Sequence, residues 1–517
     1  MNWQLVRVLA LMEARMRLRR ASTLVTLLAV AAIGWLLVPD PAGGSTQIAV
    51  GGARVLYTSS SLALGSASMA TLLFGLAGFY LLRGRMAEDQ RSGLGSVIGA
   101  SPAGNAAFVI GRWCGSVLYL LALAGAFMTT MLACHLLRGE GPLQPLVYLQ
   151  TYALVLLPML LFAASCAILC ESWAPLMGKA GDLLYFAGWV AQLGMMSSAG
   201  AGGGQPSALA LDFTGMSAIV ASLAAQVDVH DMMLGLADFD RAKAPLVLPD
   251  WLWSAELVSS RCLAALLALL PLLPALRLFH RFSPDRMKPA RARARRSPLA
   301  LLNGWARPLA RLAGPLFALS ARLPGGAGQT LADAALTLIS NPASIALLLL
   351  TQVLALALDA GRLPGLLLAC VAAWGILASE LPTRDRDAAC EALADVVPGG
   401  AARRYWRQFG ATLLLGLMFC GVAALRLAML EPLRAAALLA GLFALAALAS
   451  LLGRTSGSAR TFLALFLFGL YVSVNAGGLA ALDVVGFHGA ASASSVLGWA
   501  GAGLLAAWGG HLWNQRA

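Results

Sequence analysis

Twelve apolar stretches, each long enough to cross a lipid bilayer, run through this chain of 517 residues. A backbone inside lipid must satisfy its own hydrogen bonds, so such stretches predict membrane-spanning α-helices. The predicted spans are residues 22–38, 61–82, 106–137, 147–170, 175–198, 255–279, 343–359, 364–380, 405–429, 433–452, 461–481 and 494–513. The expected fold is an all-α integral membrane protein with about twelve transmembrane helices.

The spans form two sets of six, separated by a basic, proline-containing segment at residues 280–330. Residues 1–279 and 331–517 are therefore predicted to be two six-helix repeats joined by a linker that skims the membrane surface. All but eight of the 37 Lys and Arg residues fall on one side of this topology. The positive-inside rule then predicts that both termini are cytoplasmic.

Composition narrows the class of protein. Hydrophobic residues make up 59% of the chain and charged residues 12%, which is typical of a membrane protein and not of a soluble domain. The net charge of +13 does not come with aromatic residues interleaved in a basic patch, so nucleic acid is not an expected partner. The lipid bilayer is the expected environment. The predicted location is a cell membrane, with the bacterial inner membrane as the expected one.

One inner loop occurs in both halves. Residues 83–104 and 382–404 are longer than a turn between neighbouring helices requires. Asp89 and Asp385 are 296 positions apart, as are the two closing prolines. Each loop combines charged residues with apolar residues at helical spacing: Glu88, Asp89, Arg91, Leu94, Val97 and Ile98 in the first, and Asp385, Arg386, Asp387, Cys390, Glu391, Leu393 and Ala394 in the second.

This pattern predicts a short amphipathic helix with an apolar ridge and charged flanks in each loop. Such a helix suits docking into a groove of a soluble partner, and two equivalent sites suit a dimeric partner. A purely structural interfacial helix is the alternative. If docking is correct, charge reversal of Asp385, Asp387 and Glu391 should uncouple the partner from transport.

Three further segments have a predicted place. Residues 3–20 carry apolar residues on one helical face and arginines elsewhere, which predicts a helix lying along the membrane surface. Residues 331–342 are its weaker counterpart. The extracytoplasmic segment 199–254 contains the apolar stretch 216–227, too short to span, which predicts a re-entrant or interfacial helix. The corresponding loop of the second half, 482–493, is much shorter.

In these features the chain resembles the membrane subunits of type-2 ABC exporters, which have six spans per half. The resemblance implies that residues 3–20 are the surface helix, 86–102 and 384–398 the coupling helices, and 199–254 the re-entrant element. It implies two copies of a separate ABC nucleotide-binding subunit as partners. The chain has no GxxxxGK[ST] phosphate loop, so ATP and Mg would be bound by the partner. This chain is thus expected to be an exporter subunit without catalytic residues, metal site or cofactor of its own.

Few polar residues lie within the spans. Gln192, Gln352 and Asn475 are uncharged and deep, which favours hydrogen bonds between helices and makes them candidates for the translocation path. Ionisable residues fall near span ends, where a long side chain reaches water: Lys179, Asp182, Asp359, Glu380 and Arg426.

Two other classes stay open at this point. A secondary transporter of the major-facilitator kind also has six plus six spans and a basic central loop. The long inner loops and the lack of charges within the membrane favour the ABC interpretation over it. A membrane-embedded enzyme would need clustered catalytic groups, whereas the five histidines are scattered along the chain.

Overall fold

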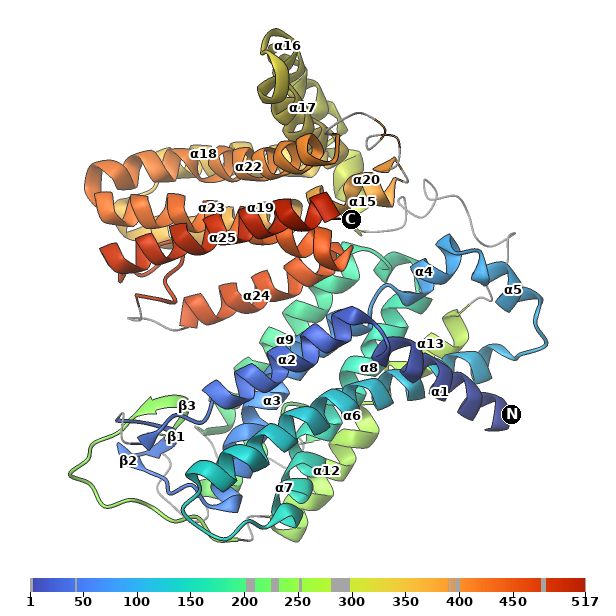
Figure 1. The fold of residues 1–517 in the computed structure, drawn as a ribbon, viewed down its shortest axis with the longest axis vertical. Coiled ribbons are helices and arrows are strands. Elements are labelled where there is room, and N and C mark those ends of the chain that lie inside the picture. Colours follow the sequence, from blue (N-terminus) through green and yellow to red (C-terminus); the bar gives the residue numbers. More distant parts are fainter. Residues whose placement is uncertain are drawn as a thin grey trace. The chain divides into compact units, whose positions relative to one another are not determined.

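A computed structural model describes residues 3–41, 44–200, 210–224, 232–250, 253–279, 298–388, 390–391, 393, 396, 400–475 and 480–516. The chain divides into two compact units, residues 1–297 and 298–517, each of them mainly helical (Figure 1). The division falls inside the segment 280–330, which the sequence predicted to be a linker.

Seven helical segments of the described chain are long and apolar enough to cross a membrane. They are α3 (Ser59–Leu82), α6 (Asn105–Arg138), α7 to α8 (Pro145–Ser172), α12 with α13 (Ala255–Leu278), η5 to α20 (Ala360–Asp387), α22 (Gly400–Leu430) and α23 (Pro432–Ser456). Counting each of two bent pairs as one span gives up to nine. A helical membrane protein is therefore confirmed. The count of twelve stays a prediction, because α9 (Lys179–Gly200), α24 (Ala459–Asn475) and α25 (Ala493–Arg516) are outside this set.

Each unit begins its bundle with a sharply bent helix pair. In the first, α1 (Trp3–Leu18) meets α2 (Ala21–Leu36) at 74°, and in the second, α17 (Gly325–Ser340) meets α18 (Pro342–Ala357) at 104°. Pro342 lacks an amide hydrogen and disfavours helical backbone at the residue before it, which ends α17. The predicted surface helices at 3–20 and 331–342 correspond to α1 and α17. Val8, Met12 and Met16 of α1 are exposed, whereas its opposite side packs on α6.

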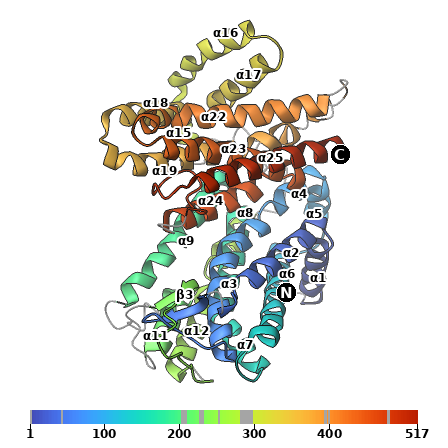
Figure 2. The same cartoon turned by 60° about the vertical axis from the view of Figure 1, so that its left-hand side comes forward.

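The same packing pattern occurs in both units. In the first unit α1, α2 and α3 contact α6, and α9 contacts α3. In the second unit α17, α18 and α19 (Leu363–Ala378) contact α22, and α24 contacts α19. The helices α18, α22, α23 and α25 run side by side in Figures 1 and 2. The two-repeat organisation stays a prediction, which this agreement supports.

The mainly helical first unit also contains a small three-stranded antiparallel sheet in the order β2-β1-β3, which the sequence did not predict. Its strands are β1 (Ser45–Val50), β2 (Ala53–Arg54) and β3 (Met232–Asp238). Gly51 and Gly52 take positive φ angles of 56° and 76°, which allows the tight turn between β1 and β2. The sheet lies at the opposite end of α3 from α4 (Figure 1).

The predicted re-entrant segment contains a short helix, α11 (Met216–Ala224), which contacts α9, α12 and α3. Arg261 of α12 (Ala255–Leu267) connects the backbone before α11 with the helical segment around Leu154. Pro158 has no amide hydrogen, so the Leu154 carbonyl accepts from Arg261 Nε at 3.0 Å, beside a π-helical turn at Tyr152–Leu156. Arg261 also donates to the carbonyl of Asp212 at 2.5 Å. The segment before α11 is thereby attached to α12.

The second unit has a simpler loop in the corresponding place. Residues 480–492 form turns, in which the Asp483 carboxylate accepts from the backbone amides of His488 and Ala490. The later part of the predicted linker, from residue 298 on, folds as α15 (Pro298–Trp305), η4 (Arg307–Ala313) and α16 (Gly314–Arg322). Figure 2 shows α16 and α17 as a helical hairpin. This part of the linker therefore belongs to the second unit.

Candidate functional site

The first inner loop folds as two short helices, not the single one predicted. α4 (Arg85–Arg91) and α5 (Leu94–Ala100) are separated by Gly93, which has a φ of 76°. Residues with side chains rarely adopt this backbone conformation, so glycine permits the break.

The amino-terminal end of α4 is held by a carboxylate from another helix. Glu171, at the end of α8 (Leu157–Ser172), accepts the amide of Gly84, and also those of Arg85 at 3.1 Å and Met86 at 3.2 Å. The first amides of a helix have no partner within it and carry partial positive charge. Glu171 therefore satisfies them and fixes α4 to the end of α8.

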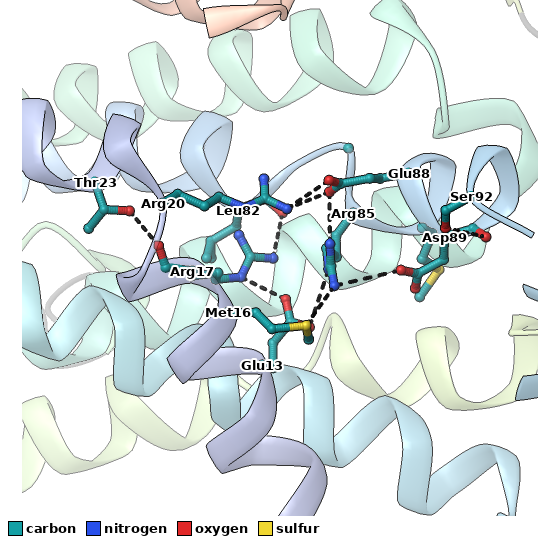
Figure 3. A network of polar contacts seen from close by, with 12 residues as sticks. Glu13, Met16, Arg17, Arg20, Thr23, Leu82, Arg85, Glu88, Asp89 and Ser92 are labelled. Atoms are coloured by element: carbon teal, nitrogen blue, oxygen red, sulfur yellow. Dashed lines mark hydrogen bonds and ion pairs between the residues drawn. The ribbon is translucent and has the colours of Figure 1, made fainter. Parts of the chain in front are cut away.

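A buried ion-pair network joins α4 to α1 and α6, and Figure 3 shows Arg85 and Asp89 of α4 near Glu13 of α1. Arg112 of α6 donates from Nη2 to Asp89 Oδ2 at 2.5 Å, and its Nε lies 3.7 Å from Glu13 Oε2 of α1. Arg85 Nε is 3.5 Å from the same Glu13 oxygen. Glu13 is 3% exposed and Asp89 is 2% exposed. The predicted role of Asp89 as an outward charged flank is therefore wrong in placement, because its carboxylate faces the bundle.

The outer part of the network fastens α1 to the loop and to α3. Glu88 accepts from Arg20 at 2.6 Å and from Arg85 at 2.8 Å. Arg17 pairs with Glu13 at 2.7 Å and donates to the carbonyls of Leu81 and Leu82, at the end of α3. One end of the surface helix and the start of the loop are thus held together as a single assembly.

The carboxylates of this network differ in pKa. Burial favours the neutral form of Glu13, but the guanidiniums of Arg17, Arg112 and Arg85 outweigh it and hold its pKa below the ordinary value. Burial raises the pKa of Asp89, and the Glu13 charge adds to this effect against Arg112 and Arg85. The pKa of Glu88 is lowered, because Arg20 and Arg85 outweigh its partial burial. Glu13 and Glu88 therefore keep their charges at more acidic pH.

The second inner loop has a related but weaker network. Asp385 Oδ2 accepts from Gln408 Nε2 at 3.0 Å and from Arg407 Nη2 at 3.3 Å. Gln408 and Arg112 are 296 positions apart, like Asp385 and Asp89. Asp333 of α17 pairs with Arg407 at 2.6 Å and with Arg384 at 2.7 Å. The loop therefore again connects its surface helix with the helix that follows it, with an amide in the place of Arg112.

Glu391 also faces inward. Its Oε1 accepts from Arg454 Nη1 at 2.7 Å and from Arg404 Nη2 at 3.0 Å. Asp385 and Glu391 are thus paired with the bundle and partly buried, whereas Asp387 of α20 (Arg384–Asp387) is exposed. The predicted helix around Cys390 and Leu393 is described only in part, because residues 389, 392, 394, 395 and 397–399, with Ala394 and Pro398 among them, lie outside the described residues.

Both loops present apolar side chains to the outside. Leu94 and Val97 are 47% and 66% exposed, and Leu393 and Val396 are 75% and 81% exposed. We call these four residues the outer ridges. Ile98 instead packs inward, against the apolar cluster around Phe108, and the side chain of Arg91 lies outside the described part of the structure. The pattern at positions 94, 97 and 98 therefore combines an exposed ridge with one buried anchor.

Three of the polar residues within the predicted spans have local partners: Gln352, Gln192 and Asp182. Gln352 Nε2 donates to the Phe419 carbonyl at 2.8 Å, which is the predicted hydrogen bond between helices. Gln192 Oε1 accepts from the Phe213 amide at 3.1 Å, and the side chain of Asn475 lies outside the described residues. Asp182 is 2% exposed and pairs with Arg83 at 2.8 Å, so the prediction that it reaches water is wrong. A translocation role for the three amides stays a prediction.

Three residues of the site were missed by sequence reasoning, although each had a signal. Glu13 is the single carboxylate in the basic segment 3–20, and Arg112 is the single Lys, Arg, Asp or Glu in the stretch 106–137. Glu171 directly follows the predicted span 147–170. A single charged residue in an apolar stretch, or a single carboxylate among arginines, indicates an internal partner, because an unpaired buried charge is costly.

No protein-family model, curated protein sequence or solved structure matches this chain. Its function is therefore inferred from the residues of the chain itself.

Proposed function

We propose that this chain is the transmembrane subunit of an ATP-driven ABC exporter, located in the bacterial inner membrane with both termini in the cytoplasm. Each inner loop would dock on one of two separate nucleotide-binding subunits, which bind ATP and Mg. One observation carries the proposal. In both units an inner loop is fastened to the bundle through ion pairs, buried in the first unit and partly buried in the second, while its outer ridge is exposed.

The internal fastening matters because a docking element can move helices only if it is attached to them. α4 contacts α8 through Glu171, α6 through Asp89 and α1 through Arg85. In the second unit, Asp385 connects with α22 and Glu391 with both α22 and α23. Removing one partner of a buried pair, such as Arg112 with Asp89, typically costs about 3–5 kcal/mol, so the joints of the first unit resist being pulled apart. Displacement of a loop would then shift the attached helices.

The outer ridges supply the contact itself. Apolar side chains at helical spacing fit a hydrophobic groove on a partner, and nearby charges such as Asp387 set the register. Because the two ridges occur in related loops, a pair of identical partners would engage both. Leu393 and Val396 are more exposed than Leu94 and Val97, which gives the second loop the larger accessible ridge.

The test is co-purification of an ATPase with the full-length chain from its native membranes in a mild detergent. The wild-type chain should retain Mg-dependent ATPase activity, and Val97→Asp combined with Leu393→Asp should lose most of it. The matched control, Val97→Leu with Leu393→Met, keeps both ridges apolar and should retain the activity. Because these positions are exposed, the aspartate variant should remain folded.

Retention of the same ATPase activity by the aspartate variant would contradict docking through the ridges. The major-facilitator alternative makes a different prediction for the same preparation. It expects no co-purified ATPase, and substrate movement in vesicles that follows an ion gradient and is insensitive to ATP.

A further inference from the structure

The second unit contains a cavity of about 240 Å³ between the start of the inner loop, the first turns of α22 and the ends of α23 and α25. Its lining includes Arg386, Arg404, Arg454, Glu391, Trp513 and Asn514. None of these residues has a role in the outer ridges.

The described lining carries an excess of positive charge, with three guanidiniums and one carboxylate. Glu391 Oε1 is shared by Arg404 and Arg454, and the third guanidinium, of Arg386, belongs to an exposed residue. The side chains of Arg404 and Arg454 are 2% and 10% exposed. Guanidinium groups form strong, charge-assisted hydrogen bonds to phosphate and carboxylate oxygens, so the lining suits an anionic ligand.

Asn514 adds a directional donor. Its Oδ1 accepts from Arg454 Nε at 3.0 Å and from Arg454 Nη2 at 2.5 Å, which fixes the orientation of the amide. Its buried Nδ2 has no hydrogen-bond partner within the described part of the chain, although Asn514 is only 3% exposed. Leaving a buried donor unsatisfied is unfavourable, and an oxygen of a bound anion would satisfy it.

The corresponding place in the first unit is filled by apolar side chains. Phe108 occupies the position 296 residues before Arg404, and Met86 the position before Pro382. Phe108 stacks on Phe279 with ring centroids 5.3 Å apart, in a buried cluster with Met86 and Ile168. The cavity is therefore a property of the second unit and not a consequence of the loop architecture.

Tryptophans surround the cavity end of α22 and α25. Trp513 lines the cavity and is 50% exposed, while Trp406 and Trp508 are 42% and 61% exposed. Both Trp406 and Trp508 have ring contacts with His511, at 5.5 Å and 6.1 Å between centroids. Exposed tryptophans gather at the depth of lipid headgroups in membrane proteins. Their grouping at this end of α22 and α25 supports a position of the cavity at headgroup depth.

We propose that this cavity binds the phosphate group of an anionic phospholipid. Arg404 and Arg454 donate to the phosphate oxygens, Arg386 contributes charge at the rim and Asn514 Nδ2 provides a further donor. The planar guanidinium group matches phosphate geometry, and basic pockets between helices at the cytoplasmic face suit lipid headgroups. The site goes beyond the proposed transport function and does not require an ATPase partner.

The test is native mass spectrometry of the full-length protein in detergent, titrated with phosphatidylglycerol or phosphatidylcholine. The wild-type chain should retain phosphatidylglycerol preferentially. Arg454→Gln should weaken this binding about tenfold, the effect of losing one charge-assisted hydrogen bond. The control is Arg403→Gln, because Arg403 is an exposed neighbour with the same charge that does not line the cavity. It should bind phosphatidylglycerol like the wild type.

Arg386→Gln provides a second variant that avoids a folding defect, because Arg386 is exposed and outside the Glu391 pairs. It should also weaken phosphatidylglycerol binding, by a smaller factor. Equal phosphatidylglycerol retention by the wild type, Arg454→Gln and Arg386→Gln would overturn the proposal. A tryptophan fluorescence response to inorganic phosphate that Trp513→Phe abolishes, without any preference for phosphatidylglycerol, would identify a site for a soluble oxyanion and overturn the lipid assignment.

Discussion

The inner ends of the two units differ in what fills the space beside the loop. In the first unit this space is filled by the buried apolar cluster around Phe108. Beside the cluster, the side chains of Glu13, Arg85, Asp89 and Arg112 form a closed ion-pair network. In the second unit the space is a polar cavity. Much of this contrast follows from the position of one arginine on the helix after the loop. In α6 the corresponding pair of positions, one turn apart, holds Phe108 and Arg112, whereas in α22 it holds Arg404 and Gln408.

Moving the arginine by one turn changes what the loop can do. At position 112 the guanidinium binds the loop carboxylate Asp89 and fixes the loop to the bundle. At position 404 it instead contacts Glu391 beside the cavity, and Asp385 is left with an amide and the partly exposed Arg407. The first loop is thus built for fixed attachment, and the second combines attachment with a ligand site.

The largest expected effect comes from removing the side chain of α6 or α22 that binds the loop carboxylate, Arg112 in the first unit and Gln408 in the second. Arg112→Leu should destabilise the protein by about 3–5 kcal/mol, because it leaves buried Asp89 and Glu13 with fewer countercharges. Gln408→Leu should cost about 1–2 kcal/mol, since Asp385 keeps its pair with Arg407. Thermal unfolding in detergent, with hydrogen exchange of α4 and α20, measures both. Arg112→Lys serves as the control that retains the charge, and equal losses at the two positions would refute the contrast.

A second comparison concerns the dry cluster and the cavity. Phe108→Ala should cost about 3–5 kcal/mol, because it leaves a void in a packed apolar cluster. Arg404→Ala should cost about 1–2 kcal/mol, since Glu391 keeps its bond to Arg454 and the space is already open. The midpoint of thermal unfolding distinguishes the two variants. A larger loss for Arg404→Ala would show that the cavity is structural core.

The smallest expected effect is a pH response confined to the first loop. The folded-state pKa values of Glu13 and Glu88 lie below the ordinary value of 4.5, so their stabilising contribution is complete above that pH and is lost as the pH falls through the folded-state values. Asp89, with a raised pKa, gains its proton earlier on acidification and does not follow this trend. Amide exchange in α4, corrected for intrinsic rates, should therefore rise on acidification below pH 4.5.

The contribution of Glu88 to that response is small, about 0.5 kcal/mol, because the side chain is half exposed and screened by solvent. Glu88→Gln should reduce the acid-induced increase in exchange without abolishing it. An acid response of α4 that is complete above pH 4.5 would contradict the assignment to Glu13 and Glu88.

Hydrophobic patterns predicted most of the helices, with α1 and α17 among them, because these follow from local residue patterns. They could not predict on which side of a short loop helix a carboxylate lies. Asp89 and Asp387 look alike in sequence, but one is buried against Arg112 and the other is exposed. That difference depends on an arginine on the next helix, which no periodicity within the loop contains.

Long-range pairing was the other limit. β1 and β3 are far apart in sequence, and Met232–Asp238 is a short apolar run inside a segment read as a loop. The hydrogen bond from Arg261 of α12 to the Leu154 carbonyl likewise depends on another helix. Pro158 has no amide hydrogen to donate to that carbonyl, so it stays available to the arginine. In both cases the determining partner lies on a distant element, so a local pattern gave no signal.

The central claim, that the outer ridges dock on an ATPase, is tested most directly by cross-linking in native membranes. A Val97→Cys chain and the exposed native Cys390 beside Leu393 would each be treated with a short thiol-to-amine cross-linker, and the products identified by mass spectrometry. Both positions should cross-link to a protein that contains a GxxxxGK[ST] phosphate loop, whereas the exposed Cys262 of α12 should not. Cross-linking of neither position to such a protein would contradict the account.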